Sequence, residues 1–230
     1  MDSLRREFDV AWTRFQSLAA LRLVPETLES EWTRGRDTYL AFLVPVDDPV
    51  AVEYLRATVR RIEQIPGVEP YSESYWHITV KGLGFETGTA AQSDEVSRRD
   101  LELVAEAAGR MFAAQPAFEV TIGPANAFPQ VVFAEVWDSL PVRELNTQLL
   151  DAFPDLIRYP FDGASFLPHI SLARFTSDEG IGQLKQALSL LRDNQPGPPL
   201  KVRDVQLVRA RLSAAAPKIE TIETYRLPAP

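Results

Sequence analysis

Two short segments of the sequence share one pattern and constrain the fold more than any other feature. Residues 77–81 read HITVK and residues 169–174 read HISLAR, and their histidines are the only two in 230 residues. Both segments are rich in β-branched and aliphatic residues, which is typical of strands. The repeat, 92 positions apart (169 − 77), therefore predicts two comparable halves, each with a strand that carries one histidine.

The rest of the sequence alternates between strand-like and helix-like segments, which favours an α+β fold. Apolar or alternating runs predict strands at 37–46, 74–85, 117–124, 130–137, 166–175, 200–212 and 218–227. Helical periodicity predicts helices at 47–67, 94–114, 141–153 and 178–193. Asp47 or Asp48 can cap the first of these helices, and Pro49 suits its first turn. Because many strands follow one another directly, we expect antiparallel pairing.

The first 33 residues or so form a segment of their own in this interpretation. Leu4, Phe8, Trp12 and Phe15 recur at the spacing of one helix face. We therefore predict a helical extension over residues 1–33, followed by a single domain over 34–230. Such an extension could cover one half of that domain, shape the mouth of a substrate site or mediate dimerisation.

Composition narrows the class of partner. The net charge of −8 disfavours a protein that grips duplex DNA, because such proteins usually present a basic surface to the phosphates. There are no cysteines, so disulfides, thiol nucleophiles and cysteine-bound zinc do not apply. No run of about 18 apolar residues suggests a membrane span, and the start lacks the pattern of a secretory signal. We expect a cytoplasmic monomer without a membrane partner.

Strand alternation places functional groups beside each histidine. In a regular strand His77, Thr79 and Lys81 share one face. His169 and Ser171 do the same in the second motif, whereas Arg174 lies at an odd offset. A bulge or the end of the strand would be needed to bring Arg174 to the histidine face.

Two imidazoles, two hydroxyls and two cations suit acid–base chemistry at a phosphate. One imidazole can accept a proton while the other donates one, because the unperturbed pKa of histidine is about 6.5. Hydroxyls and cations can bind the non-bridging oxygens. Two alternatives remain at this point. The histidines could be structural residues of a non-catalytic nucleotide-binding module, or they could bind a metal with carboxylates, although no close-spaced third ligand accompanies them.

The two motifs together resemble those of the two-histidine (2H) phosphoesterase superfamily. The segment WHITVKGLG is similar to that family's first motif, and PHISLARF is similar to its second, including the arginine five residues after the histidine. The run YLAFLVPVDDP also resembles the opening strand and helix start of the family. The resemblance spans roughly residues 37–227, and within it the serine at 171 replaces the more common threonine.

The resemblance implies a function and a fold. The superfamily includes bacterial 2′-5′ RNA ligase-like proteins and RNA 2′,3′-cyclic phosphodiesterases. The resemblance therefore implies a short RNA end or a small cyclic nucleotide as the substrate. His77 and His169 would be the catalytic acid–base pair. Thr79, Ser171, Lys81 and Arg174 would bind the phosphate. No cofactor and no metal would be required, and two antiparallel sheets with outer helices would enclose a cleft about a pseudo-twofold axis.

Aromatic residues near the motifs are candidates for stacking on a base. Trp76, Phe85 and Phe166 flank the motif strands, and single-stranded nucleic acid ends often stack on such side chains. Trp76 and Phe166 are at odd offsets from their histidines, however, which favours the opposite face of the strand. We interpret the GLG at 82–84 as a strand terminator, because no P-loop pattern follows it.

Overall fold

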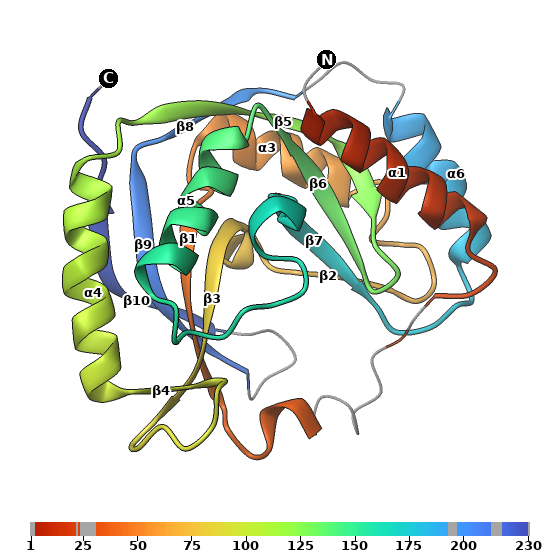
Figure 1. The fold of residues 1–230 in the computed structure, drawn as a ribbon. Coiled ribbons are helices and arrows are strands. Elements are labelled where there is room, and N and C mark those ends of the chain that lie inside the picture. Colours follow the sequence, from red (N-terminus) through yellow and green to blue (C-terminus); the bar gives the residue numbers. More distant parts are fainter. Residues whose placement is uncertain (1–2, 22, 24–30, 193–196, 213–217, 230) are drawn as a thin grey trace.

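The computed structural model describes residues 3–21, 23, 31–192, 197–212 and 218–229. One curled sheet forms the centre of the molecule, with helices packed around it (Figure 1). The strand order is β10-β9-β1-β3-β7-β6-β5-β8. The strands of this path are β1 (Thr38–Pro45), β3 (His77–Thr87), β5 (Phe118–Ala127), β6 (Val131–Trp137), β7 (His169–Phe175), β8 (Pro199–Val202), β9 (Asp204–Arg211) and β10 (Lys218–Arg226).

The sheet consists of two four-stranded halves that meet at the two motif strands. All neighbours along the path are antiparallel, and β3 and β7 are joined through a single residue pair, Ile78 and Ile170. Two short strands lie off the path: β2 (Val68–Pro70) pairs with β7, and β4 (Glu95–Ser97) runs parallel to β3. The predicted α+β fold with two antiparallel halves is confirmed, and the halves form one sheet because of that central pair.

The halves of the structure do not coincide with the halves of the sequence. The C-terminal strands β9 and β10 return to the first half, where β9 pairs with β1. The segment 200–212, predicted as one strand, divides at Arg203, and β8 belongs to the second half through its pairing with β5. The single-strand prediction was wrong there, because a hydrophobic pattern does not show which neighbour each part pairs with.

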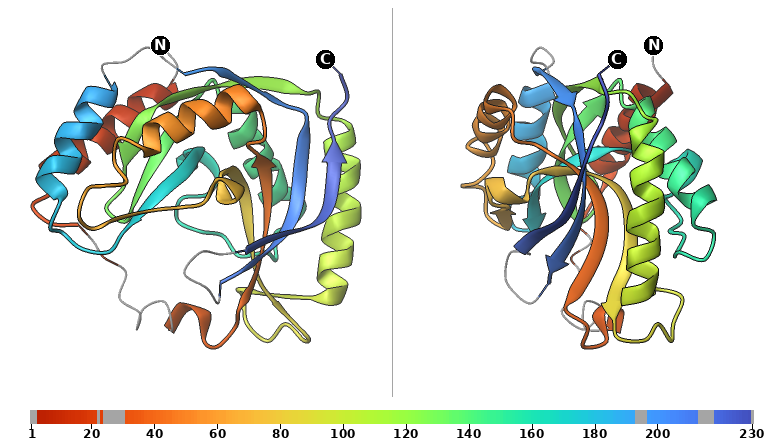
Figure 2. Two further views of the ribbon diagram at one scale, coloured as in Figure 1. Left: turned by 180° about the vertical axis from the view of Figure 1, so that it is seen from behind. Right: turned by 90° about the vertical axis from the view of Figure 1, so that its left-hand side faces the viewer.

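The helices cover the sheet and pack their apolar residues against it. They are α3 (Pro49–Val59), α4 (Arg98–Ala113), α5 (Leu140–Ala152) and α6 (Ile181–Arg192), with single 3-10 turns η1 (Glu73–Tyr75) and η2 (Gly163–Ser165) before β3 and β7. Asp48 caps α3 through the amides of Val50 and Ala51, as predicted. The helix ends at Val59, earlier than residue 67, and turns follow. Helix α4 packs beside β10 (Figure 2), where Phe112 meets Phe42 and Tyr225.

Helix α1 spans Ser3–Ser17 and residues 31–33 are also helical, so the extension predicted over residues 1–33 is helical in two separate stretches. Residues 18–21 are not helical, and residues 22 and 24–30 lie outside the described part of the chain. At the C-terminal end of α1, a side chain of another helix binds the backbone carbonyls. Lys185 Nζ on α6 donates to Gln16 O at 2.8 Å and to Leu18 O at 2.6 Å. This tertiary contact has no local sequence signal.

The glycines at 82–84 do not end the strand, so that prediction was wrong. Strand β3 continues to Thr87, and its register with β1 shifts at Leu40/Ala41, opposite this segment. Gly84 has a φ of 122°, and a Cβ there would lie 2.6 Å from Asp94 O. Glycine is required at 84 for two reasons: its φ is positive, and β4 runs directly beside β3 and leaves no room for a Cβ.

Candidate active site

The two histidines lie on neighbouring strands and line one cavity. Ile78 and Ile170 form the pair that joins β3 to β7, and both are fully buried. His77 and His169 precede these residues on the two antiparallel strands, so they flank the pair on the opposite face of the sheet. Both histidines and Thr79 line a cavity of about 1180 Å³. The predicted juxtaposition of the two motifs is therefore present.

Each imidazole is oriented in the same way by its own chain. His77 Nδ1 lies 2.5 Å from Tyr75 O, and His169 Nδ1 lies 2.9 Å from Leu167 O. A carbonyl can only accept, so Nδ1 carries the proton in both neutral rings and Nε2 is the nitrogen that can accept another. In both cases the acceptor is two residues before the histidine: Tyr75 is the last residue of η1, and Leu167 follows two residues after the end of η2.

Aromatic rings hold both imidazoles from the side. Tyr75 contacts His77 edge to face at 5.0 Å between centroids. Phe128 and Phe133 contact His169, each at 5.2 Å. Such packing restricts the rings to one orientation.

Burial shifts the protonation of both histidines. It lowers the pKa of His77 to about 4, from a usual value of 6.5; the Tyr75 hydrogen bond opposes the shift and His169 adds to it. Burial also lowers the pKa of His169, against the hydrogen bond from its ring to Leu167 O. Both rings are therefore neutral near pH 7 when no ligand is bound. An anion bound between them would favour the protonated form of either ring.

The two motif strands carry a bulge at the same position. The register between β1 and β3 skips Val80, and the register between β6 and β7 skips Leu172, each three residues after its histidine. Beyond the bulge the alternation is shifted by one residue. Gly82 and Arg174, five residues after the histidines, therefore take the side of the strand that alternation had assigned to Lys81 and Ala173. Gly82 lines the cavity.

Lys81 does not reach the cavity, and its prediction as a phosphate ligand is corrected. The side chain is fully buried, and Nζ donates to Gly82 O (2.7 Å), Ile157 O (2.7 Å) and Asp162 Oδ2 (2.9 Å). These three contacts use all three donors of the ammonium. Lys81 therefore holds the segment 157–162 against β3 and is not available to a ligand.

The other predicted phosphate ligands lie at different distances from the cavity. Thr79 belongs to its lining, whereas Ser171 and Arg174 do not. Ser171 lies on β7 two residues after His169 and is half-buried. Arg174 is paired with Glu69 on β2, with Nε and Nη2 each 2.8 Å from Oε2. The bulge that the sequence required for Arg174 exists, but this arginine contacts the carboxylate of Glu69, its cross-strand partner on β2.

The predicted stacking residues are mostly core residues. Trp76 and Phe85 are 4% and 0% exposed and lie outside the cavity lining, so their assignment as base-stacking residues is corrected. Trp76 belongs to the main core, and Phe85 packs against Trp32 and Tyr39. Phe166 contributes to the cavity wall although it is 5% exposed. An odd offset from the histidine explains Trp76, whereas Phe85, opposite Tyr39 on β1, is covered by the rings of Trp32 and Tyr39.

Sequence reasoning missed most of the aromatic wall. Tyr75 lies beside His77, while Tyr159 and Phe161 are stacked on each other with centroids 5.1 Å apart. The Tyr39 and Tyr159 hydroxyls form a hydrogen bond that ties β1 to the segment held by Lys81. The aromatic residues of the lining are Trp32, Tyr39, Tyr75, Phe128, Tyr159, Phe161 and Phe166. Phe128, Tyr159 and Phe161 lie in loops, where periodicity gives no signal.

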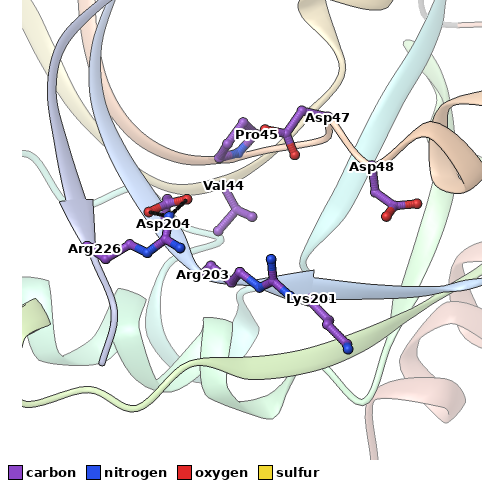
Figure 3. A pocket seen from close by; sticks show the side chains of 8 residues that line it. All are labelled: Val44, Pro45, Asp47, Asp48, Lys201, Arg203, Asp204 and Arg226. Atoms are coloured by element: carbon purple, nitrogen blue, oxygen red, sulfur yellow. Dashed lines mark hydrogen bonds and ion pairs between the residues drawn. The ribbon is translucent and has the colours of Figure 1, made fainter. Parts of the chain in front are cut away.

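A second, smaller hollow of about 280 Å³ has neither histidine in its lining (Figure 3). Its charged residues largely have roles within the fold: Asp48 caps α3, and Arg226 lies 3.3 Å from Asp204. The lining consists of Val44, Pro45, Asp47, Asp48, Lys201, Arg203, Asp204 and Arg226. It has no imidazole and no aromatic wall, so the larger cavity is the candidate active site.

Two further properties concern the described residues as a whole. Across the ranges given above, no three histidine, aspartate or glutamate side chains are grouped so that they could hold a metal ion. In the same ranges, no helix combines the length and the apolar character that crossing a membrane would need.

A family model described as the 2′-5′ RNA ligase superfamily matches residues 45–213, which include both motifs. The chain belongs to this superfamily. The match covers most of the sheet and all of the helices from α3 to α6, whereas α1 precedes it and β10 follows it. No curated protein sequence matches the chain.

Solved structures share the fold of this superfamily member at low sequence identity. TT0787 of Thermus thermophilus has a TM-score of 0.60 at 18% identity, with 83% of this chain and 98% of that chain covered. E. coli LigT complexed with phosphate has a TM-score of 0.57 at 18% identity, covering 84% and 99%. The conserved protein of unknown function ATU0111 from Agrobacterium tumefaciens has a TM-score of 0.58 at 15% identity, covering 97% and 98%. At these identities the likeness shows the fold alone.

Proposed function

We propose that this superfamily member is a metal-independent phosphodiesterase that opens a 2′,3′-cyclic phosphate, or cleaves a 2′-5′ linkage, in a short RNA or small nucleotide. One observation carries the proposal. Two imidazoles, each with Nδ1 bound to a carbonyl two residues earlier, flank one residue pair and line the same cavity. Binding alone does not need two proton-transfer groups in matched orientation.

The reaction can be written with its protons in balance. Water attacks the phosphorus and loses a proton to Nε2 of one neutral imidazole, while the P–O3′ bond breaks. The other imidazole, protonated in the complex, gives its proton to O3′, so that the product is a 2′-phosphomonoester. Burial lowers the pKa of both histidines, so both rings are neutral in the free protein. The negative charge of the bound phosphate raises the pKa again and stabilises one ring in its protonated form. The Thr79 hydroxyl, which lines the cavity, would bind a non-bridging oxygen.

The lining and size of the cavity and the net charge of the chain support a small or short substrate. Its aromatic wall suits a base, and its volume of about 1180 Å³ is large enough for a nucleotide. The chain has a net charge of −8, which disfavours long nucleic acid. A LigT structure of the same fold was solved with 3′-AMP, which supports a nucleotide ligand here.

Single substitutions at the histidines test the proposal. His77→Ala and His169→Ala should each lower kcat on a 2′,3′-cyclic nucleotide by about 10²–10⁴-fold, the range for loss of a general acid or base. Lys201→Ala, in the separate smaller hollow, serves as the control and should keep the wild-type rate. The reaction should proceed with excess chelator present. Wild-type rates in both histidine variants, or loss of activity with chelator, would overturn the mechanism.

A further inference from the structure

Helix α1 presents two different faces, and one of them belongs to the cavity. Leu4, Phe8 and Phe15 are buried, as the helical pattern predicts. Beside this stripe the residues that line the cavity are Glu7, Val10, Ala11 and Arg14. Their spacing of three, one and three residues is that of one helix face. Val10 is 65% exposed, which identifies this face as the open side of the helix.

The helix lies on the same side of the sheet as the histidines. Phe8 packs on Phe133 at 6.1 Å between centroids, and Phe133 in turn contacts His169. Figure 1 shows α1 crossing the half of the sheet that contains β5 and β6. The carbonyl of Phe8 also accepts a hydrogen bond from Asn126 Nδ2 at 3.0 Å, which fixes α1 to β5.

Ion pairs fix the position of α1 along its length. Arg143 on α5 forms two hydrogen bonds with Glu7, of 2.9 and 2.7 Å, and donates a third to Phe166 O. Arg192 on α6 lies 3.1 Å from Asp9. Contacts from several elements therefore hold α1 at the edge of the cavity as a part of its wall.

Of the two charged residues that α1 contributes to the cavity wall, one is a cation that can bind a ligand. The charge of Glu7 is balanced by Arg143, whose two terminal nitrogens each donate a hydrogen bond to that carboxylate. Apart from the histidines, Glu7 and Arg14 are the charged residues that line the cavity. Within the described part of the chain, the guanidinium of Arg14 forms no ion pair or hydrogen bond. A guanidinium beside apolar wall residues is suited to bind a phosphate through two parallel hydrogen bonds.

We propose that Arg14 binds a second anionic group of the substrate, the terminal phosphate of a nucleotide whose reacting phosphate lies between the histidines. The placement of the reacting phosphate rests on the proposed function. The site then prefers a nucleotide with an additional 5′-phosphate over the same nucleotide with a 5′-hydroxyl. The family match begins at residue 45, so this contact is a property of the segment that precedes it.

Binding of two product-like ligands tests this inference without relying on turnover. A nucleoside 2′,5′-bisphosphate should bind the wild-type protein about tenfold more tightly than the nucleoside 2′-phosphate, as measured by calorimetry. Arg14→Ala should abolish the difference and leave the affinity for the 2′-phosphate unchanged. Arg14→Lys should retain part of it. Arg6→Ala is the matched control, because Arg6 is exposed on the same helix, carries the same charge and lies outside the cavity lining.

The outcomes separate this inference from the proposed function. The inference is overturned if the wild-type protein does not prefer the bisphosphate, or if the preference persists in Arg14→Ala. It is also overturned if Arg14→Ala weakens both ligands equally, since Arg14 would then contact the base or the reacting phosphate. If the preference depends on Arg14 but no cyclic nucleotide is turned over, the second phosphate site stands and the proposed reaction fails.

Discussion

Replacing Lys81 with methionine distinguishes a buried structural cation from a phosphate ligand. The substitution keeps most of the side-chain stem and removes the ammonium. Three hydrogen bonds are lost, and Asp162, whose side chain is 5% exposed, is left without its cation. Breaking a buried ion pair from one side costs about 3–5 kcal/mol. Two contacts that remain on Asp162, from Asn146 and from the Tyr159 amide, place the expected loss near the lower end of that range.

The measurement is urea unfolding at pH 7, with the activity assayed at a low temperature where the variant is folded. Lys81→Met should lower the free energy of unfolding by about 3 kcal/mol. Adding Asp162→Asn should recover part of this loss, because no unpaired charge then remains in the interior. Arg98→Met is the control: its i,i+4 pair with Glu102 is 88% and 68% exposed, and its loss should change stability little. Unchanged stability together with a large rise in KM would refute the structural role.

Three further predictions follow from the site. Acidification should destabilise the protein between about pH 6.5 and 4, because the histidine of the unfolded chain binds a proton there and the buried His77 of the folded chain does not. His77→Gln should therefore weaken the pH dependence of the unfolding free energy, measured by urea titrations from pH 7 to 5. Phe8→Ala should cost about 3–5 kcal/mol in thermal or urea unfolding and lower kcat, because Phe8 supports Phe133 beside His169. Trp76→Phe should leave KM unchanged, since Trp76 faces the core; a raised KM would return it to the cavity.

The fold class and the pairing of the motifs could be predicted because strand periodicity and the rare histidines act locally. A histidine, a hydroxyl and alternating aliphatic residues define a face without knowledge of the neighbours. The same rule failed for Lys81, since a bulge at Val80 shifts the side chains that directly follow it by one position. The register with β1 decides that bulge, and a single strand's sequence does not contain it.

Tertiary contacts explain the remaining differences. Strands β9 and β10 return to the first half because β9 pairs with β1, a choice made between segments far apart in the chain. The aromatic wall comes from loops such as that of Tyr159, whose position depends on the buried contacts of Lys81 and Asp162. The sequence left several roles open for the N-terminal extension, among them covering one half of the domain and shaping the mouth of the site. The packing of Phe8 on Phe133 places α1 at the cavity.

The central claim is that His77 and His169 act as one unit in proton transfer, and a double-mutant cycle on kcat tests it most directly. The turnover of a 2′,3′-cyclic nucleotide is measured, with chelator, for the wild type, His77→Ala, His169→Ala and the double variant. We expect either single variant to lose nearly as much rate as the double variant, because a proton donor without its acceptor is of little use. Losses that multiply in the double variant, or a wild-type rate in either single variant, would contradict a shared acid–base site.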